Sequence, residues 1–237
     1  MRYCLLTGNI GAGKSTVAEE LRKVGLPVIS ADQMMKDIYR NDSQVRGTVI
    51  AKFGPDAFDP FGSLSQELRD KALASRDVYT FLSDLIRHPM SAMLAGIMNH
   101  LCHYPGGHDA VFVESATLDP WIWQWCRPES MPTWIFSIST SDIDARIERV
   151  VDRYKKRFNI KTENYGFCAL PDAELEMNRR KLDEYRKMVR LTDQLQTDIN
   201  NELLKNTPSL VKPSVMLNDE EGDARLIAMR INDICRL

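Results

Sequence analysis

A glycine-rich run near the N-terminus has the residue types and spacing that bind phosphate. The run is Gly8-Asn9-Ile10-Gly11-Ala12-Gly13-Lys14-Ser15-Thr16. A short apolar stretch, residues 2–6, precedes it, and apolar residues recur at helical spacing after it. A strand, a loop of the form GxxxxGKS and a helix, in this order, are the required context of a phosphate-binding loop (P-loop). The run therefore predicts a nucleoside triphosphate site.

Each residue type in this loop has a chemical task. Gly8, Gly11 and Gly13 let the backbone curl until its N–H groups converge on phosphate oxygens, at the positive end of a helix dipole. The Lys14 ammonium group supplies a charge for the β- and γ-phosphates, and the Ser15 hydroxyl is the expected Mg²⁺ ligand. We therefore expect ATP and Mg²⁺ as cofactors.

Two acidic residues follow predicted strands. Asp32 comes just after the strand 26–29, and Glu114 ends the strand 110–113. Ligands of doubly wound sheets bind in the crevice at the carboxyl ends of the strands. Asp32 is thus a candidate catalytic and acceptor-binding residue, or else the N-cap of a helix over 33–39. Glu114 is a candidate to hold Mg²⁺ through water beside the acceptor, or else a cap of the following turn.

Composition and pattern together favour one α/β domain. The chain has 237 residues, of which 43% are hydrophobic and 27% charged, and its apolar runs are too short to span a membrane. Strands alternating with helices predict a parallel, helix-flanked sheet. Five scattered cysteines suit free thiols in a reducing cytoplasm. Because a strand begins at once, we expect no signal peptide, and we expect a monomer or a small homo-oligomer.

Three parts of this single domain are predicted. The nucleotide-binding core comprises 1–40, 109–145 and 214–237. Residues 41–108 are expected to form a helical acceptor-binding subdomain, broken at 53–55, 60–62 and 88–89. Residues 146–213 are expected to form a basic helical lid with an extended insertion, since 13 Lys or Arg and 8 Asp or Glu lie between Arg146 and Arg190. Trp121, Trp123 and Trp125 are interpreted as packing against the core, or as a platform for a base.

The motifs resemble those of dephospho-coenzyme A kinases. That family typically reads G-G-I-G-S-G-K-S-T and then an apolar strand ending D-A-D, where this chain has the run at 8–16 and then Ser30-Ala31-Asp32. The elements at 53–54, 62–64 and 88–89 also follow the family's order. The resemblance covers most of residues 1–100 and continues more loosely to Asn218. It implies the fold of P-loop kinases.

The resemblance also implies roles. The γ-phosphoryl group of ATP would pass to the ribose 3′-hydroxyl of dephospho-coenzyme A, with Asp32 as the base. Arg149 and Arg153 would hold ATP, Asn218 would lie near the adenine, and His88 would lie beside the acceptor. The chain departs from the family at Ser30, at 115–119, at Gln66 and in the length of 160–213.

These departures leave other acceptors open. A deoxynucleoside monophosphate, or a modified nucleotide within DNA, would need the same loop and the same base. A non-catalytic ATP-binding switch is a further alternative, although a switch has no need of a base at Asp32. The acceptor is therefore expected to be a small nucleotide-like molecule, with nucleic acid as the less favoured partner.

Overall fold

The computed structural model describes residues 2–103, 107–108, 110–116, 134–163, 170–205, 212–218 and 223–236. The three tryptophans 121, 123 and 125 lie outside the described residues.

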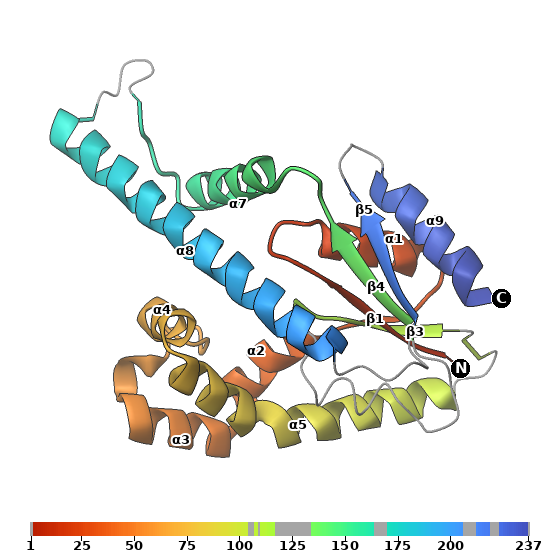
Figure 1. Cartoon of the computed structure of the whole chain (residues 1–237). Coiled ribbons are helices and arrows are strands. Elements are labelled where there is room, and N and C mark those ends of the chain that lie inside the picture. The colour runs from red at the N-terminus through yellow and green to blue at the C-terminus, as the bar shows by residue number, and fades with distance from the viewer. Residues whose placement is uncertain are drawn as a thin grey trace.

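Five parallel strands form one sheet at the centre of the molecule (Figure 1). They are β1 (Arg2–Gly8), β2 (Val28–Ser30), β3 (Ala110–Glu114), β4 (Trp134–Ser139) and β5 (Lys212–Leu217). Their order is β2-β3-β1-β4-β5, so β1 is central and pairs with β3 and β4. The predicted α/β fold is confirmed. Because all five carboxyl ends meet at one edge, the loop after β1 lies between the ends of β3 and β4.

Both faces of the sheet are buried, as expected when helices connect parallel strands. On one face Leu6, Phe112 and Phe136 pack against α1 (Lys14–Lys23) and α9 (Asp223–Arg236). The helices α1 and α9 also contact each other. The two ends of the described chain meet on this side, where the Arg2 guanidinium donates to the Cys235 carbonyl.

The opposite face packs against α2 (Ala31–Asn41) and α5 (Arg76–Cys102). Between these helices lie α3 (Ser43–Phe53), the 3₁₀ turn η1 (Pro55–Ala57) and α4 (Gln66–Ala74). The predicted breaks at 53–55 and 60–62 are confirmed. The predicted break at His88-Pro89 is wrong, since α5 runs through Pro89. Proline inside a helix costs about 3 kcal/mol, whereas Ile86, Met90 and Leu94 are buried on this helix, at about 1.5–3 kcal/mol each.

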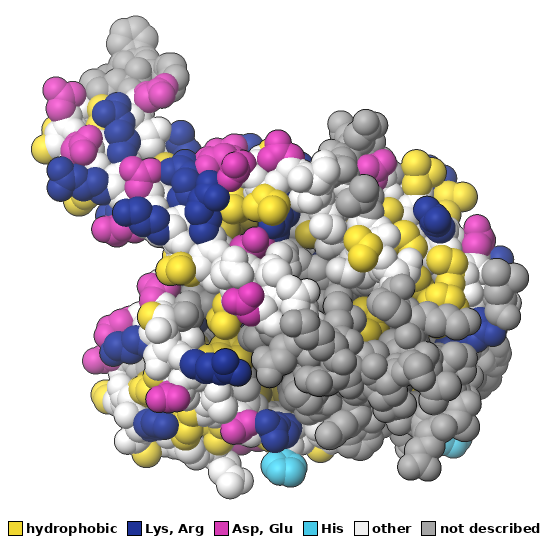
Figure 2. All heavy atoms as spheres, viewed as in Figure 1, with side chains coloured by type: hydrophobic (Ala, Val, Ile, Leu, Met, Phe, Trp, Pro, Cys, Tyr) yellow, Lys and Arg dark blue, Asp and Glu magenta, His cyan; other side chains and the backbone are white. Residues whose placement is uncertain are grey.

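Helices α7 (Ile143–Arg157) and α8 (Asp172–Lys205) form an arm that projects from the sheet (Figure 1). The carboxylate of Asp142 caps α7 by accepting from the Ala145 N–H group at 2.9 Å. The two helices are held together by the buried side chains Ile147, Val150, Val151, Leu182 and Val189. Figure 2 shows a hollow between the arm and the helices α3 and α4, with Lys and Arg side chains gathered on the arm above it. No helix within the described residues has the length and apolar character needed to cross a bilayer.

Candidate active site

The P-loop between β1 and α1 is closed tightly around two glycines. Gly8 has a φ of 146°, and a Cβ there would lie 2.1 Å from the Ile138 carbonyl oxygen of β4. Gly13 has a φ of 87°, and a Cβ there would lie 2.2 Å from Asn218 Nδ2. Real Cβ atoms do not make contacts this short. Glycine is therefore required at both positions by conformation and by space.

The N-terminus of α1 has no side-chain cap among the residues that the structure describes. Its N-cap is Gly13, which offers no side-chain acceptor to the first turn. A helix begins with N–H groups that have no partner within the helix, and the dipole makes this end positive. Side chains ordinarily satisfy such groups, but here a phosphate oxygen can do so.

Lys14 is partly buried at this point, and its Nζ donates to the Asn9 carbonyl at 3.1 Å. Burial lowers the pKa of Lys14, and the positive charges of Arg146 and Arg153 lower it further. The negative charges of Asp32 and Glu114 raise this pKa and so offset part of the decrease. The charges of these four groups all act on Lys14. The predicted residues Lys14, Asp32, Glu114 and Arg153 are thus brought together.

Ser15 and Glu114 form a direct contact across the end of the sheet. Ser15 Oγ donates to Glu114 Oε1 at 2.7 Å. Glu114 is buried at the carboxyl end of β3 and faces Leu6 of β1 in the strand register. Both groups offer the oxygen ligands that Mg²⁺ prefers. Their pairing fits a magnesium ion bound through the hydroxyl and, by way of water, through the carboxylate.

Asp32 lies in the first turn of α2 and is exposed. The N-cap of this helix is Ser30, whose Oγ accepts from the Gln33 N–H group at 3.4 Å. The alternative interpretation of Asp32 as the N-cap is therefore wrong, because the helix begins two residues earlier than predicted. The Asp32 carboxylate thus does not cap α2, and its charge acts on Lys14.

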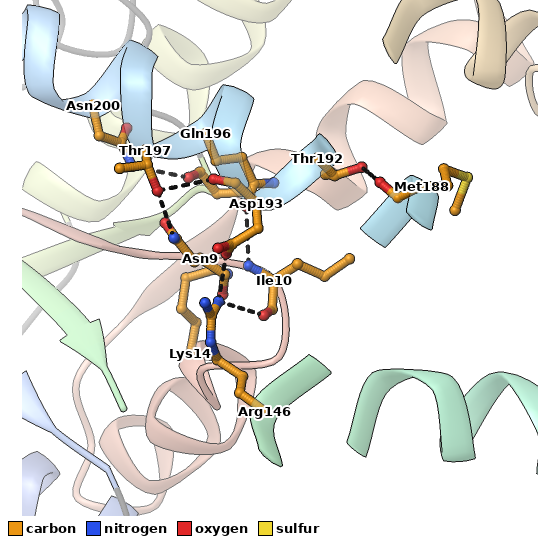
Figure 3. Close-up of polar contacts among 11 residues, drawn as sticks. Asn9, Ile10, Lys14, Arg146, Met188, Thr192, Asp193, Gln196, Thr197 and Asn200 are labelled. Atoms are coloured by element: carbon orange, nitrogen blue, oxygen red, sulfur yellow. Dashed lines mark hydrogen bonds and ion pairs between the residues drawn. The ribbon is translucent and has the colours of Figure 1, made fainter. Parts of the chain in front are cut away.

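A second group of polar contacts holds the first half of the P-loop (Figure 3). Arg146 Nη1 donates to the Ile10 carbonyl at 2.9 Å and to Asp193 Oδ1 at 2.6 Å. The Ile10 N–H group donates to Gln196 Oε1 at 2.9 Å, and Asn9 Nδ2 donates to Thr197 Oγ1 at 2.8 Å. Gln196 of α8 thus satisfies the Ile10 N–H group, and Arg146 of α7 satisfies the Ile10 carbonyl.

Asn218 holds the second half of the loop. Its Nδ2 donates to the Ala12 carbonyl at 2.9 Å, and its N–H group donates to the Ser139 carbonyl at 2.8 Å. The end of β5 is thereby fixed to both the P-loop and the end of β4. This contact joins Asn218 to the P-loop, and its predicted place near the adenine stays a prediction.

Two predicted residues are not joined to the loop. His88 is exposed on α5, and the side chain of Arg149 is exposed on α7. No hydrogen bond or ion pair between described residues links either side chain to the P-loop. Arg153, one turn beyond Arg149, donates its Nε to the Arg149 carbonyl at 3.4 Å.

Sequence reasoning missed Arg146, Asp193, Gln196 and Thr197. Arg146 could have been found, because it precedes Arg149 by three residues and Arg153 by seven, and therefore shares their helix face. The three α8 residues carry no such signal, since they lie more than 180 positions from the loop and meet it only through the tertiary fold.

Comparisons with known proteins agree with this geometry. Residues 3–113 match the family model described as dephospho-CoA kinase. The N-terminal part of the chain is therefore similar in sequence to dephospho-CoA kinases. A dephospho-CoA kinase of Aquifex aeolicus is 30% identical over 119 residues, which are 50% of this chain and 58% of that protein. A dephospho-CoA kinase of Aeromonas hydrophila is 30% identical over 91 residues, or 38% of this chain and 44% of that protein.

The chain spans about half the length of these curated dephospho-CoA kinases. Among solved structures, the dephospho-CoA kinase from Campylobacter jejuni superimposes with a TM-score of 0.53 at 19% identity, over 100% of this chain and 98% of that one. This similarity shows that the two proteins share a fold. The sequence match with the dephospho-CoA kinases is concentrated in the N-terminal half, which contains the P-loop, Asp32 and the helices α2 to α5.

Proposed function

We propose that this protein is an ATP-dependent kinase that transfers the γ-phosphoryl group to a hydroxyl of a nucleotide-like acceptor. The favoured acceptor is the ribose 3′-hydroxyl of dephospho-CoA. The observation that carries this proposal is the 2.7 Å contact between Ser15 and Glu114 beside Lys14. It brings a hydroxyl, a carboxylate and an ammonium group to the open N-terminus of α1.

Each of these groups has a task in phosphoryl transfer. The N–H groups of α1 and the Lys14 ammonium group bind the phosphates of ATP, and the buried position of Lys14 strengthens its attraction to them. Ser15 and Glu114 would hold Mg²⁺, which when bound neutralises charge on the transferring phosphoryl oxygens. Little covalent chemistry remains for the protein beyond positioning and proton transfer.

Asp32 is the proposed base. It is exposed at the start of α2, with no capping role, and its charge acts on Lys14. A carboxylate in this place can accept the proton of an acceptor hydroxyl that lies between it and the phosphates. This also argues against a non-catalytic switch, which has no use for such a base.

The acceptor is tested by a screen with radiolabelled ATP. Purified protein and Mg²⁺ are incubated with dephospho-CoA, deoxynucleoside monophosphates, or DNA carrying a modified base. Labelled coenzyme A is the expected product. A labelled deoxynucleoside diphosphate or labelled DNA would keep the kinase and replace the acceptor. Binding of ATP without transfer to any acceptor would contradict the proposal and favour the switch.

A further inference from the structure

The C-terminal half of α8 meets the P-loop through polar contacts. The α8 side chains in the apolar arm cluster, among the described residues, end at Val189. Beyond that point Asp193, Gln196 and Thr197 lie along one face of the helix at spacings of three and four residues. These three residues are called the α8 clamp. They face the Asn9-Ile10 end of the loop (Figure 3).

Hydrogen bonds attach each residue of the α8 clamp to the P-loop or to Arg146. The Ile10 N–H group, the Asn9 side chain and the Arg146 guanidinium each donate to one clamp residue, at 2.6–2.9 Å. Arg146 connects the clamp back to the loop through the Ile10 carbonyl. The guanidinium is 4% exposed and its partner carboxylate 13% exposed. Removing either partner of such a pair would leave a buried charge unpaired.

Among the described residues, packing against the sheet does not replace these contacts. A pocket of about 410 Å³ lies beside the clamp, lined by Thr7, Ser137 and Val215 of the sheet and by Thr197 and Asn200 of α8. The connection between this part of α8 and the nucleotide loop therefore depends strongly on the clamp. A loop whose N–H and C=O groups are already fixed loses less conformational freedom when phosphate binds.

We infer that the α8 clamp is a positioning element of the nucleotide site, which holds the P-loop in the shape that binds ATP. The inference rests on the proposed ATP-binding function and adds to it residues of the long α8 insertion. Because coupling between two sites is reciprocal, ATP must in turn strengthen the attachment of α8.

The test compares two glutamines of the same helix. Gln196 accepts from Ile10, whereas the one hydrogen bond of the Gln194 side chain to another described residue is to Asp198 within α8, at 2.8 Å. Titration calorimetry with ATP and Mg²⁺ should show the Kd rising about 2- to 10-fold in Gln196→Ala, the equivalent of one lost hydrogen bond. Gln194→Ala should keep the wild-type Kd. In turnover, Gln196→Ala should raise KM with little change in kcat.

A second readout separates positioning from simple stability. ATP should slow hydrogen exchange at the backbone amides of 193–198 in the wild type, and less so in Gln196→Ala. If the wild type binds ATP and Gln196→Ala binds it equally well, the clamp inference is overturned while the kinase proposal stands. Equal weakening in Gln194→Ala would also overturn the inference. A wild-type protein that binds no ATP would overturn the kinase proposal itself.

Discussion

At the scale of single residues, the site depends on charges that the fold brings together from separate helices and a strand. Lys14 is surrounded by two carboxylates and two guanidinium groups, and burial lowers its pKa. An ammonium group in such a place binds phosphate strongly because less water competes for it.

Lys14→Ala should therefore lower kcat by at least about 10²- to 10³-fold, the usual cost of removing one transition-state donor. The fold should persist, because the variant removes a charge that burial disfavours. Steady-state kinetics and a thermal melt check both points. Turnover of ATP close to the wild-type rate would contradict the assigned role of the loop.

The lowered pKa of Lys14 also gives a pH dependence with a definite sign. The charged ammonium group binds phosphate, so the affinity for ATP should be highest at pH values below the pKa of Lys14 in the folded protein. The affinity should fall as the pH rises through this pKa. Since that pKa lies below 10.5, the fall should begin at a lower pH than for an ordinary lysine. Calorimetry between pH 7 and 10 measures it, with Lys14→Arg as the control that stays charged. An affinity as pH-sensitive in Lys14→Arg as in the wild type would assign the effect to another group.

Asp32 and Ser30 provide a matched pair, because one is the proposed base and the other is the cap. Asp32→Asn should lower kcat by about 10²- to 10⁴-fold and leave the melting temperature unchanged. Ser30→Ala should instead lower stability by about 0.5–2 kcal/mol with kcat nearly unchanged. Full activity of Asp32→Asn on its true acceptor would remove the base from the mechanism.

At the scale of elements, α7 presents three arginines to the site in unequal ways. Arg146 is buried against the loop, the charge of Arg153 reaches Lys14, and the Arg149 side chain is exposed. Arginines three and seven residues apart lie on one side of a helix. Arg146 can therefore contact the loop while Arg149 and Arg153 remain able to bind ATP.

Arg153→Ala should consequently raise the KM for ATP and lower kcat, because an arginine fork both positions and neutralises phosphoryl oxygens. Arg149→Ala is expected to have a smaller effect, and the double variant tests whether the two act together. Unchanged kinetics in the double variant would place both side chains on an ordinary solvated face of α7.

At the scale of the whole molecule, the nucleotide site draws on parts far apart in the chain: the loop after β1, Glu114 of β3, Arg146 of α7, the α8 clamp, and Asn218 after β5. A ligand that binds where so many elements meet stabilises all of them together.

ATP with Mg²⁺, at about 100 times its Kd, should stabilise the folded state by about 2.7 kcal/mol. For a chain of this size that corresponds to a rise of roughly 5–11 °C in Tm. Adenosine at the same concentration serves as the control, since it lacks the phosphates that the loop binds. A thermal shift for adenosine as large as that for ATP would contradict phosphate recognition by the loop.

Much of this arrangement could be predicted from local sequence. The P-loop and the strand 110–113 depend on neighbouring residues and on the apolar pattern, and each is predicted to within a residue or two. Pro89 was misinterpreted because tertiary packing outweighs a local helix-breaking tendency. Ser30 was missed as a cap because Asp32 is an equally good capping type. The α8 clamp could not be predicted, since it depends on contacts between distant segments.

The attachment of Asn218 and α8 to a loop within the first 16 residues has a consequence for biosynthesis. A ribosome releases the N-terminal end first, so the P-loop leaves the exit tunnel while the residues that fix its shape have yet to be translated. Until β5 has been made and inserted beside β4, the loop of the nascent chain lacks the contact with Asn218. If ATP binds as proposed, we expect a chain that stops before residue 218 to bind it more weakly than one extended past that residue.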